Sequence, residues 1–256
     1  MEKFFIDSRE GKKISVILEK NDNQKGLVFV MHGLGSSKEA DYIKSFAKAF
    51  REKGFTVVRF DNRHSIGESE GDYRDVNFTK TYQDLVDVIN WSKKQSWHSE
   101  KFVLVGHSLG GGCVLWYGSN HPEDLLAIVP ISTVIGGHQT LAKFDKKDLI
   151  QFLGAREKLS FISRILLEWK WWKFKEDILK YDIVPEAHKF NMPFLMIVGD
   201  QDNNTPLEDQ MKLYKGIPGD KEIHVIEGAH HAFREEQHLK ETEEIIKNWI
   251  DNKLLK

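Results

Sequence analysis

The sequence predicts an α/β fold: a mainly parallel, twisted sheet of about eight strands with helices on both faces. Short apolar runs of strand length alternate along the chain with longer segments whose apolar residues recur at helical spacing. The central runs are apolar at nearly every position, which is typical of strands covered on both faces. Repeated strand–helix units of this kind form parallel sheets.

The chain begins with a predicted hairpin and one strand–helix unit. β-rich runs at residues 3–7 and 14–19 flank a turn-like Glu-Gly-Lys, and an apolar strand is expected at 27–31. A capping-box pattern that starts at Ser36 precedes a helix that Gly54 ends.

The rest of the chain repeats this unit. Further strands are expected at residues 55–60, 101–105, 125–131, 193–198 and 222–226. Helices are expected around 78–89, 109–120 and 207–215, and at the C-terminus around Ile245, Ile246, Trp249 and Ile250.

One segment interrupts the alternation. About sixty residues separate the strand that ends near Ile131 from the strand that begins near Pro193, far more than a crossover helix needs. We therefore expect an α/β core, residues 1–131 and 192–256, and an inserted helical cap, residues 132–191. Open α/β sheets bind ligands at the carboxyl ends of their strands, where such a cap would lie.

The composition narrows the function classes. The 256 residues are 40% hydrophobic and 30% charged, with a formal net charge of −2 and no long run of one sign, so we expect no nucleic-acid partner. The single cysteine, Cys113, excludes an intramolecular disulfide, and no metal-ligand spacing or dinucleotide fingerprint occurs. We therefore expect no metal and no cofactor.

Nothing in the sequence indicates export or a membrane span. Residues 1–8 carry charges, unlike a signal peptide, and no apolar stretch approaches the roughly 20 residues that cross a bilayer. We therefore expect a cytoplasmic protein without stable membrane association, acting as a monomer or homodimer on a small-molecule substrate.

The strongest chemical signal is Gly-His-Ser-Leu-Gly at residues 106–110. A bare Gly-x-Ser-x-Gly often arises by chance, but here it lies between an apolar strand and a helix rich in small residues. That context defines a nucleophile elbow, a sharp turn that exposes the serine hydroxyl and leaves room only for small neighbours. Ser108 is therefore the predicted nucleophile.

A serine hydroxyl needs a base and an orienting carboxylate, which follow the serine in the chain order Ser, Asp/Glu, His. The loop after strand 193–198 offers Asp200 and Asp202, and the loop after strand 222–226 offers His230 and His231. The residues alone leave both pairs open.

Together these residues resemble the α/β-hydrolase superfamily of serine hydrolases. The family carries Gly-x-x-Asp after its seventh strand, matching 199–202, and Gly-Ala-x-His-x-Phe after its eighth, matching 228–233. The resemblance selects Asp202 and His231 over their near neighbours, which stay as alternatives.

The resemblance also implies an oxyanion hole. One backbone N–H comes from Leu109, the residue after the nucleophile, and the second from the loop after the third strand. That loop, at residues 31–35, is similar to the family's His-Gly-x motif and nominates Leu34. We expect His32 and His107 to make structural hydrogen bonds.

A further stretch, Asp61 to Gly71, is similar to the Asp-x-x-Gly-x-Gly-x-Ser-x-Gly loop of small bacterial and archaeal esterases, including feruloyl (cinnamoyl) esterases and monoacylglycerol lipases. Residues 62–66 depart from that pattern, because Asn-Arg-His-Ser-Ile replaces its glycine-bearing part. The departure argues against one named esterase subfamily and leaves the superfamily resemblance intact.

Three of the seven tryptophans lie in the predicted cap, within residues 166–174. We expect Trp169 and Trp172 to form part of a hydrophobic wall over Ser108 that contacts an apolar or aromatic acyl group. The alternative is a helix that its large side chains anchor to the sheet.

The predicted reaction is hydrolysis of carboxylic esters, with short-chain or aromatic acyl groups, through an acyl-enzyme on Ser108. Because His231 must be neutral to act as the base, activity should rise as the pH climbs through about 6 to 7. A thioesterase, amidase, peptidase or carbon–carbon hydrolase would use the same three residues. A non-catalytic hydrolase-like protein that binds a ligand is the alternative of another class.

Overall fold

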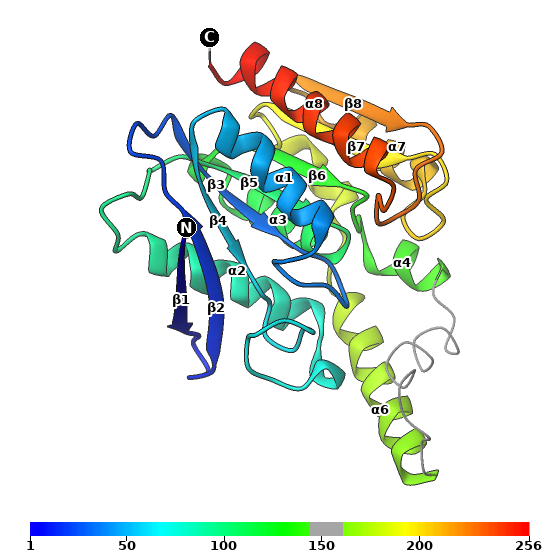
Figure 1. Cartoon of the computed structure of the whole chain (residues 1–256). Helices are drawn as coiled ribbons and strands as arrows, with labels where there is room; N and C mark the ends of the chain where they lie inside the picture. The colour runs from blue at the N-terminus through cyan, green and yellow to red at the C-terminus, as the bar shows by residue number, and fades with distance from the viewer. Residues whose placement is uncertain (144–160, 256) are drawn as a thin grey trace.

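The computed structural model describes residues 1–143 and 161–255, which form one eight-stranded sheet flanked by helices (Figure 1). The strand order is β1-β2-β4-β3-β5-β6-β7-β8, which confirms the predicted α/β fold. β1 pairs antiparallel with β2 and β2 with β4, whereas every later pairing is parallel. The strands are Glu2–Asp7 (β1), Lys13–Glu19 (β2), Gly26–Met31 (β3), Phe55–Phe60 (β4), Phe102–His107 (β5), Leu125–Ile131 (β6), Phe194–Gly199 (β7) and Lys221–Ile226 (β8).

Helices cover both faces of the sheet, as the continuously apolar strands predict. Helices α1 (Asp41–Glu52) and α8 (Glu236–Lys253) pack against one face, where the core includes Phe46 and Trp249. Helices α2 (Phe78–Ser92), α3 (Leu109–Asn120) and α7 (Leu207–Gly216) pack against the other face. Short 3-10 turns occur at Tyr73–Asp75 (η1), Pro122–Asp124 (η2) and Val184–Lys189 (η3).

Helix α1 begins at Asp41, later than the capping-box pattern at Ser36 suggests. The loop before the helix carries Lys38, which forms a buried ion pair. The Lys38 ammonium lies 2.6 Å from the Asp61 carboxylate, and both side chains are buried. The Ser36 hydroxyl accepts a hydrogen bond from Tyr42 (2.5 Å) instead of capping the helix.

The parallel strands bring their carboxyl ends to one edge of the sheet. Met31 at the end of β3 is in register with Gly106 near the end of β5, and Gly199 of β7 is in register with Ile226 of β8. The loops that follow β3, β5, β7 and β8 therefore meet at this edge.

Between β6 and β7 the structure describes α4 (Gly137–Lys143) and α6 (Phe161–Ile178). Helix α6 is tied to α2 and η1 by polar contacts: Thr79 Oγ1 donates to Asp177 (2.6 Å), and Lys170 pairs with Asp75. Residues 144–160 of the predicted cap lie outside the described residues.

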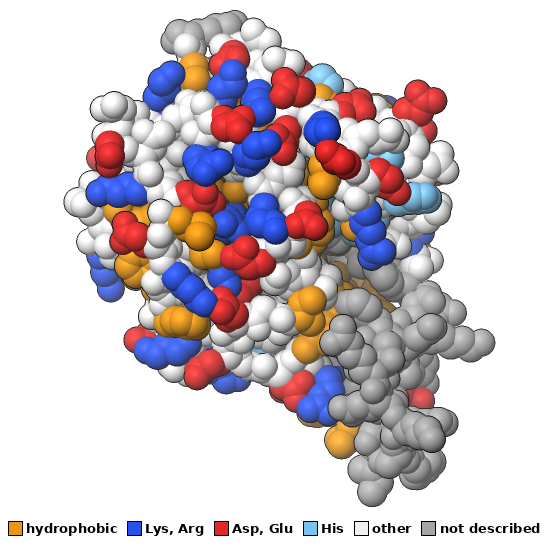
Figure 2. Space-filling model, viewed as in Figure 1, with side chains coloured by type: hydrophobic (Ala, Val, Ile, Leu, Met, Phe, Trp, Pro, Cys, Tyr) orange, Lys and Arg blue, Asp and Glu red, His pale blue; other side chains and the backbone are white. Residues whose placement is uncertain are grey.

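Basic and acidic side chains are interspersed over the face shown in Figure 2, as the near-zero net charge suggests. Within residues 1–143 and 161–255, no helix is both long and apolar enough to span a bilayer.

Candidate active site

Ser108 occupies a sharp turn between β5 and α3. Its backbone has a φ of 56°, a strained conformation for a residue other than glycine. The flanking glycines are required by close approach: a Cβ at Gly106 would lie 2.5 Å from the Gly110 carbonyl oxygen, and a Cβ at Gly110 would lie 2.4 Å from that of His32. This local crowding explains the small residues of the motif.

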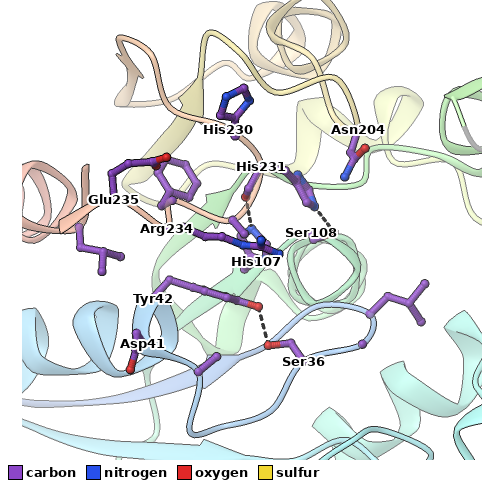
Figure 3. A pocket seen from close by; sticks show the side chains of 16 residues that line it. Ser36, Asp41, Tyr42, His107, Ser108, Asn204, His230, His231, Arg234 and Glu235 are labelled. Atoms are coloured by element: carbon purple, nitrogen blue, oxygen red, sulfur yellow. Dashed lines mark hydrogen bonds between the residues drawn. The ribbon is translucent and has the colours of Figure 1, made fainter. Parts of the chain in front are cut away.

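Ser108, His231 and Asp202 form one hydrogen-bonded chain. Figure 3 shows the link between His231 and Ser108. The Asp202 carboxylate accepts the His231 Nδ1–H (2.9 Å), which leaves the lone pair of Nε2 to accept the Ser108 hydroxyl proton (2.9 Å). This tautomer places an unprotonated nitrogen beside the serine oxygen, as a general base requires.

The neighbouring candidates lie elsewhere. Asp200 accepts a hydrogen bond from the Gly228 N–H (2.7 Å), which shapes the adjoining loop. His230 is exposed, and its Nδ1–H donates to the Gln201 carbonyl (3.2 Å). The structure therefore brings Asp202 and His231, and neither Asp200 nor His230, to Ser108.

Both Asp202 oxygens are held by the β7 loop. Oδ1 accepts the N–H groups of Asn204 and Thr205 (2.9 Å each), and Oδ2 accepts the Thr205 hydroxyl (2.8 Å). Burial raises the pKa of Asp202, but the hydrogen bonds from His231 and Thr205 outweigh it, so the pKa of this carboxyl lies below its usual range. Asp202 is therefore an anion that fixes the histidine.

Gln210 supports this loop from helix α7. Its buried amide donates to the Thr133 carbonyl (2.7 Å) and to the Thr205 carbonyl (3.3 Å), which joins the loop after β6 to the loop after β7. Neither Thr205 nor Gln210 belongs to a motif that predicts the site. Threonine three residues after an aspartate is a typical turn pattern, so Thr205 had a weak signal and Gln210 had none.

His32 and His107 hold backbone beside the site. His107 Nε2–H donates to the His231 carbonyl (2.7 Å), and His32 Nε2 accepts the Asn62 N–H (3.0 Å). Burial lowers the pKa of both imidazoles, that of His107 to about 3, so His107 is neutral at physiological pH. Both rings act as neutral hydrogen-bonding groups.

Leu34 and Leu109, the predicted oxyanion donors, both lie beside Ser108. Leu109 is the first residue of α3, where backbone N–H groups have no intrahelical partner. The loop that carries Leu34 passes close by, since a Cβ at Gly33 would lie 2.8 Å from the Ser108 Cβ. Both leucines line the same small cavity as Ser108.

Ser108 opens onto two spaces of different character. One is a cleft of about 920 Å³ that His231 also lines, with charged, polar and apolar residues in its wall (Figure 3). The other is a small apolar cavity of about 30 Å³, which is enough for about two water molecules. The cavity is lined by Leu34, Ser108, Leu109, Val134, Thr140, Leu141, Trp171 and Phe174.

The structure places a different tryptophan at the cavity from those expected. Trp169 and Trp172 are 49% and 56% exposed and line neither space, whereas Trp171 is 9% exposed and lines the apolar cavity with Phe174. Residues three apart share a helix face, so the face of α6 that carries Trp171 and Phe174 turns inward and the face that carries Trp169 and Trp172 turns outward.

Comparison with known proteins places this geometry in a family. The model of the family described as "Serine aminopeptidase, S33" matches residues 22–171 and 179–238. The chain belongs to this family. Among curated proteins, the S33 chain is 23% identical over 248 residues to an Escherichia coli "uncharacterized 31.7 kDa protein in traX-finO intergenic region", covering 84% of this chain and 86% of that one.

Solved structures show the α/β-hydrolase fold for this S33 family member. Est1E from Butyrivibrio proteoclasticus, solved with bound ferulic acid, is 20% identical with a TM-score of 0.78, covering 99% of this chain and 100% of that chain. The Pyrococcus furiosus esterase Pf2001 is 19% identical with a TM-score of 0.74, covering 99% and 90%.

Proposed function

We propose that the protein is a serine carboxylesterase in which Ser108 is the nucleophile, His231 the base and Asp202 the orienting carboxylate. The observation that carries the proposal is the continuous hydrogen-bonded chain from Asp202 through His231 to Ser108, 2.9 Å at each step. The esterases among its structural neighbours support the same reaction class.

In the proposed reaction the Ser108 oxygen attacks the ester carbonyl while its proton passes to His231 Nε2. The N–H groups of Leu34 and Leu109 stabilise the oxyanion, and the protonated His231 gives its proton to the departing alcohol. A water molecule, deprotonated in turn by His231, then cleaves the acyl-enzyme and releases the carboxylic acid.

The apolar cavity is the proposed acyl pocket, and its size favours short acyl chains. Ser108, which carries the acyl group, lines it together with both proposed oxyanion donors. Thr140, Leu141, Trp171 and Phe174 come from the segment between β6 and β7, so we propose that residues 132–191 act as a cap that closes this pocket.

Hydrolysis of p-nitrophenyl esters with two to twelve acyl carbons, by wild type and Ser108→Ala, tests the proposal. We expect turnover that falls with acyl length, that is abolished in the variant, and covalent labelling of Ser108 by a fluorophosphonate. Absence of turnover and of labelling, in protein whose circular dichroism shows it to be folded, would overturn the proposal.

The family description favours a second candidate, an aminopeptidase. An aminopeptidase would need a carboxylate in the cleft to bind the free amino terminus of its substrate. The carboxylates that line the cleft are Asp41 and Glu235. Each already has a partner, since Asp41 pairs with Lys44 (2.8 Å) and Glu235 accepts a hydrogen bond from His238 (3.0 Å). Aminoacyl p-nitroanilides distinguish the candidates, because only an aminopeptidase would prefer them to p-nitrophenyl acetate.

A further inference from the structure

The two spaces beside Ser108 would each hold one part of a bound ester, the acyl group or the alcohol. His231, which must protonate the departing alcohol, lines the larger cleft and not the small apolar cavity. The acyl group, which stays on Ser108, has the apolar cavity beside the proposed oxyanion donors. The alcohol part of the ester therefore occupies the larger cleft.

Some of the charged side chains that line the cleft have partners of opposite charge or hydrogen-bond partners, and one has none among the described residues. Of its two carboxylates, Asp41 pairs with Lys44 of α1, and Glu235, the residue before α8, accepts a hydrogen bond from His238 of that helix. The Arg234 side chain also lines the cleft and is exposed to solvent, and its guanidinium forms no ion pair with a carboxylate within residues 1–143 and 161–255. A cation left unpaired in a cleft attracts an anionic ligand.

Arg234 faces the space that the alcohol must fill. It lies three residues after His231 in the same loop, and Figure 3 shows its side chain reaching inward above Tyr42. Burial raises the pKa of the Tyr42 phenol, whereas the Ser36 hydrogen bond and the charge of Arg234 act in the opposite direction. The Tyr42 ring lies 4.6 Å from that of His107, which is adjacent to Ser108 in the chain.

From this arrangement we propose that Arg234 is a specificity-determining residue that binds an anionic group, a carboxylate or a phosphate, on the alcohol part of the ester substrate. The inference rests on the proposed esterase function and names its substrate class. The substrates would be short-chain esters whose alcohol part carries a carboxylate or a phosphate group. Guanidinium is suited to both anions because its planar N–H groups bind two oxygens at once.

The experiment compares matched acetate esters that differ in charge. The substrates are 3-acetoxybenzoate, the neutral ester 3-acetoxybenzamide and 3-acetoxyphenyl phosphate, each assayed with wild type, Arg234→Gln and Arg234→Lys. Lys240→Gln is the control for charge loss, because Lys240 lies on α8, is highly exposed and lines neither space at Ser108.

We expect Arg234→Gln to lower kcat/KM for a charged ester about tenfold relative to the neutral ester, mainly through KM, since charge-assisted hydrogen bonds are lost. Arg234→Lys should restore part of this ratio, and Lys240→Gln should leave it unchanged. The preference of the wild type should also weaken at high salt. The carboxylate and phosphate esters show which anion the site prefers.

An unchanged charged-to-neutral ratio in Arg234→Gln, with the neutral ester still hydrolysed, would overturn this inference and leave the esterase proposal standing. Failure of the wild type to hydrolyse any of the three esters would overturn both. Thermal unfolding of each variant shows whether the ratio is measured on folded protein.

Discussion

Asp202 shows how the site is built at the scale of single residues. Three donors from the β7 loop and the His231 imidazole hold its two oxygens, and Gln210 anchors the loop from a neighbouring helix. Such surroundings fix both the charge of the carboxylate and the direction in which it holds the imidazole.

Asp202→Asn should lower kcat by about three to four orders of magnitude, because an amide cannot hold His231 in the required tautomer. The matched control is Asp200→Asn, two residues away, whose amide oxygen can still accept the Gly228 N–H. It should retain nearly full activity. A larger loss in Asp200→Asn than in Asp202→Asn, measured with p-nitrophenyl acetate, would reverse the assignment of the two carboxylates.

Thr205→Val should lower kcat about tenfold with little change in KM, because the isosteric side chain no longer donates to Asp202 Oδ2. Thr205→Ser keeps the hydroxyl and should restore most of the activity. Equal kcat values for the valine and serine variants would show that this hydroxyl does not position Asp202.

At the scale of elements, helix α6 shapes the small apolar cavity that is the proposed acyl pocket. Its sequence carries large aromatic residues on more than one face, so periodicity alone does not show which face turns toward the core. Contacts with α2 and η1, through Asp177 and Lys170, set the rotation that puts Trp171 inside.

Trp171→Ala should enlarge the proposed acyl pocket and raise the activity on hexanoate relative to acetate. Trp172→Ala, on the exposed face, should not change that ratio. The chain-length profile with p-nitrophenyl esters measures the effect. Trp171→Ala should also lower the melting temperature more, because its side chain is buried. A chain-length shift in Trp172→Ala alone would place the acyl group elsewhere.

At the scale of the whole molecule, the buried imidazoles beside Ser108 make the free energy of unfolding depend on pH. In the unfolded chain His107 takes up a proton near pH ~6.5, whereas in the native state burial lowers its pKa to about 3. Between these values the unfolded state binds more protons, so the free energy of unfolding falls as the pH drops from about 6.5 to about 3. Burial of His32 acts in the same direction.

His107→Asn should therefore flatten the dependence of the unfolding free energy on pH between 4 and 6. Removing one proton that only the unfolded chain binds changes the slope by up to ~1.4 kcal/mol per pH unit. Urea unfolding of wild type and variant at pH 4.5, 5.5 and 7 measures this slope. Parallel curves would mean that His107 does not titrate between the two states.

The sequence alone determined the features that depend on residues close together in the chain. Continuously apolar runs predicted the strands, helical spacing predicted the helices, and the Gly-x-Ser-x-Gly turn predicted an exposed Ser108, because each pattern reflects local backbone geometry. The start of α1 differed from its local pattern, since the buried pair of Lys38 and Asp61 takes up the residues before it.

The tertiary structure decided between residues that are close in sequence. Residue type alone does not separate Asp202 and His231 from Asp200 and His230, although the family resemblance favours the first pair. The paths of the loops after β7 and β8 bring that pair to Ser108. The choice of Trp171 over its neighbours depends on the rotation of α6. Such features arise from contacts between segments far apart in the chain, and the physical reason is that orientation and pairing are set by packing across the fold, which no local pattern encodes.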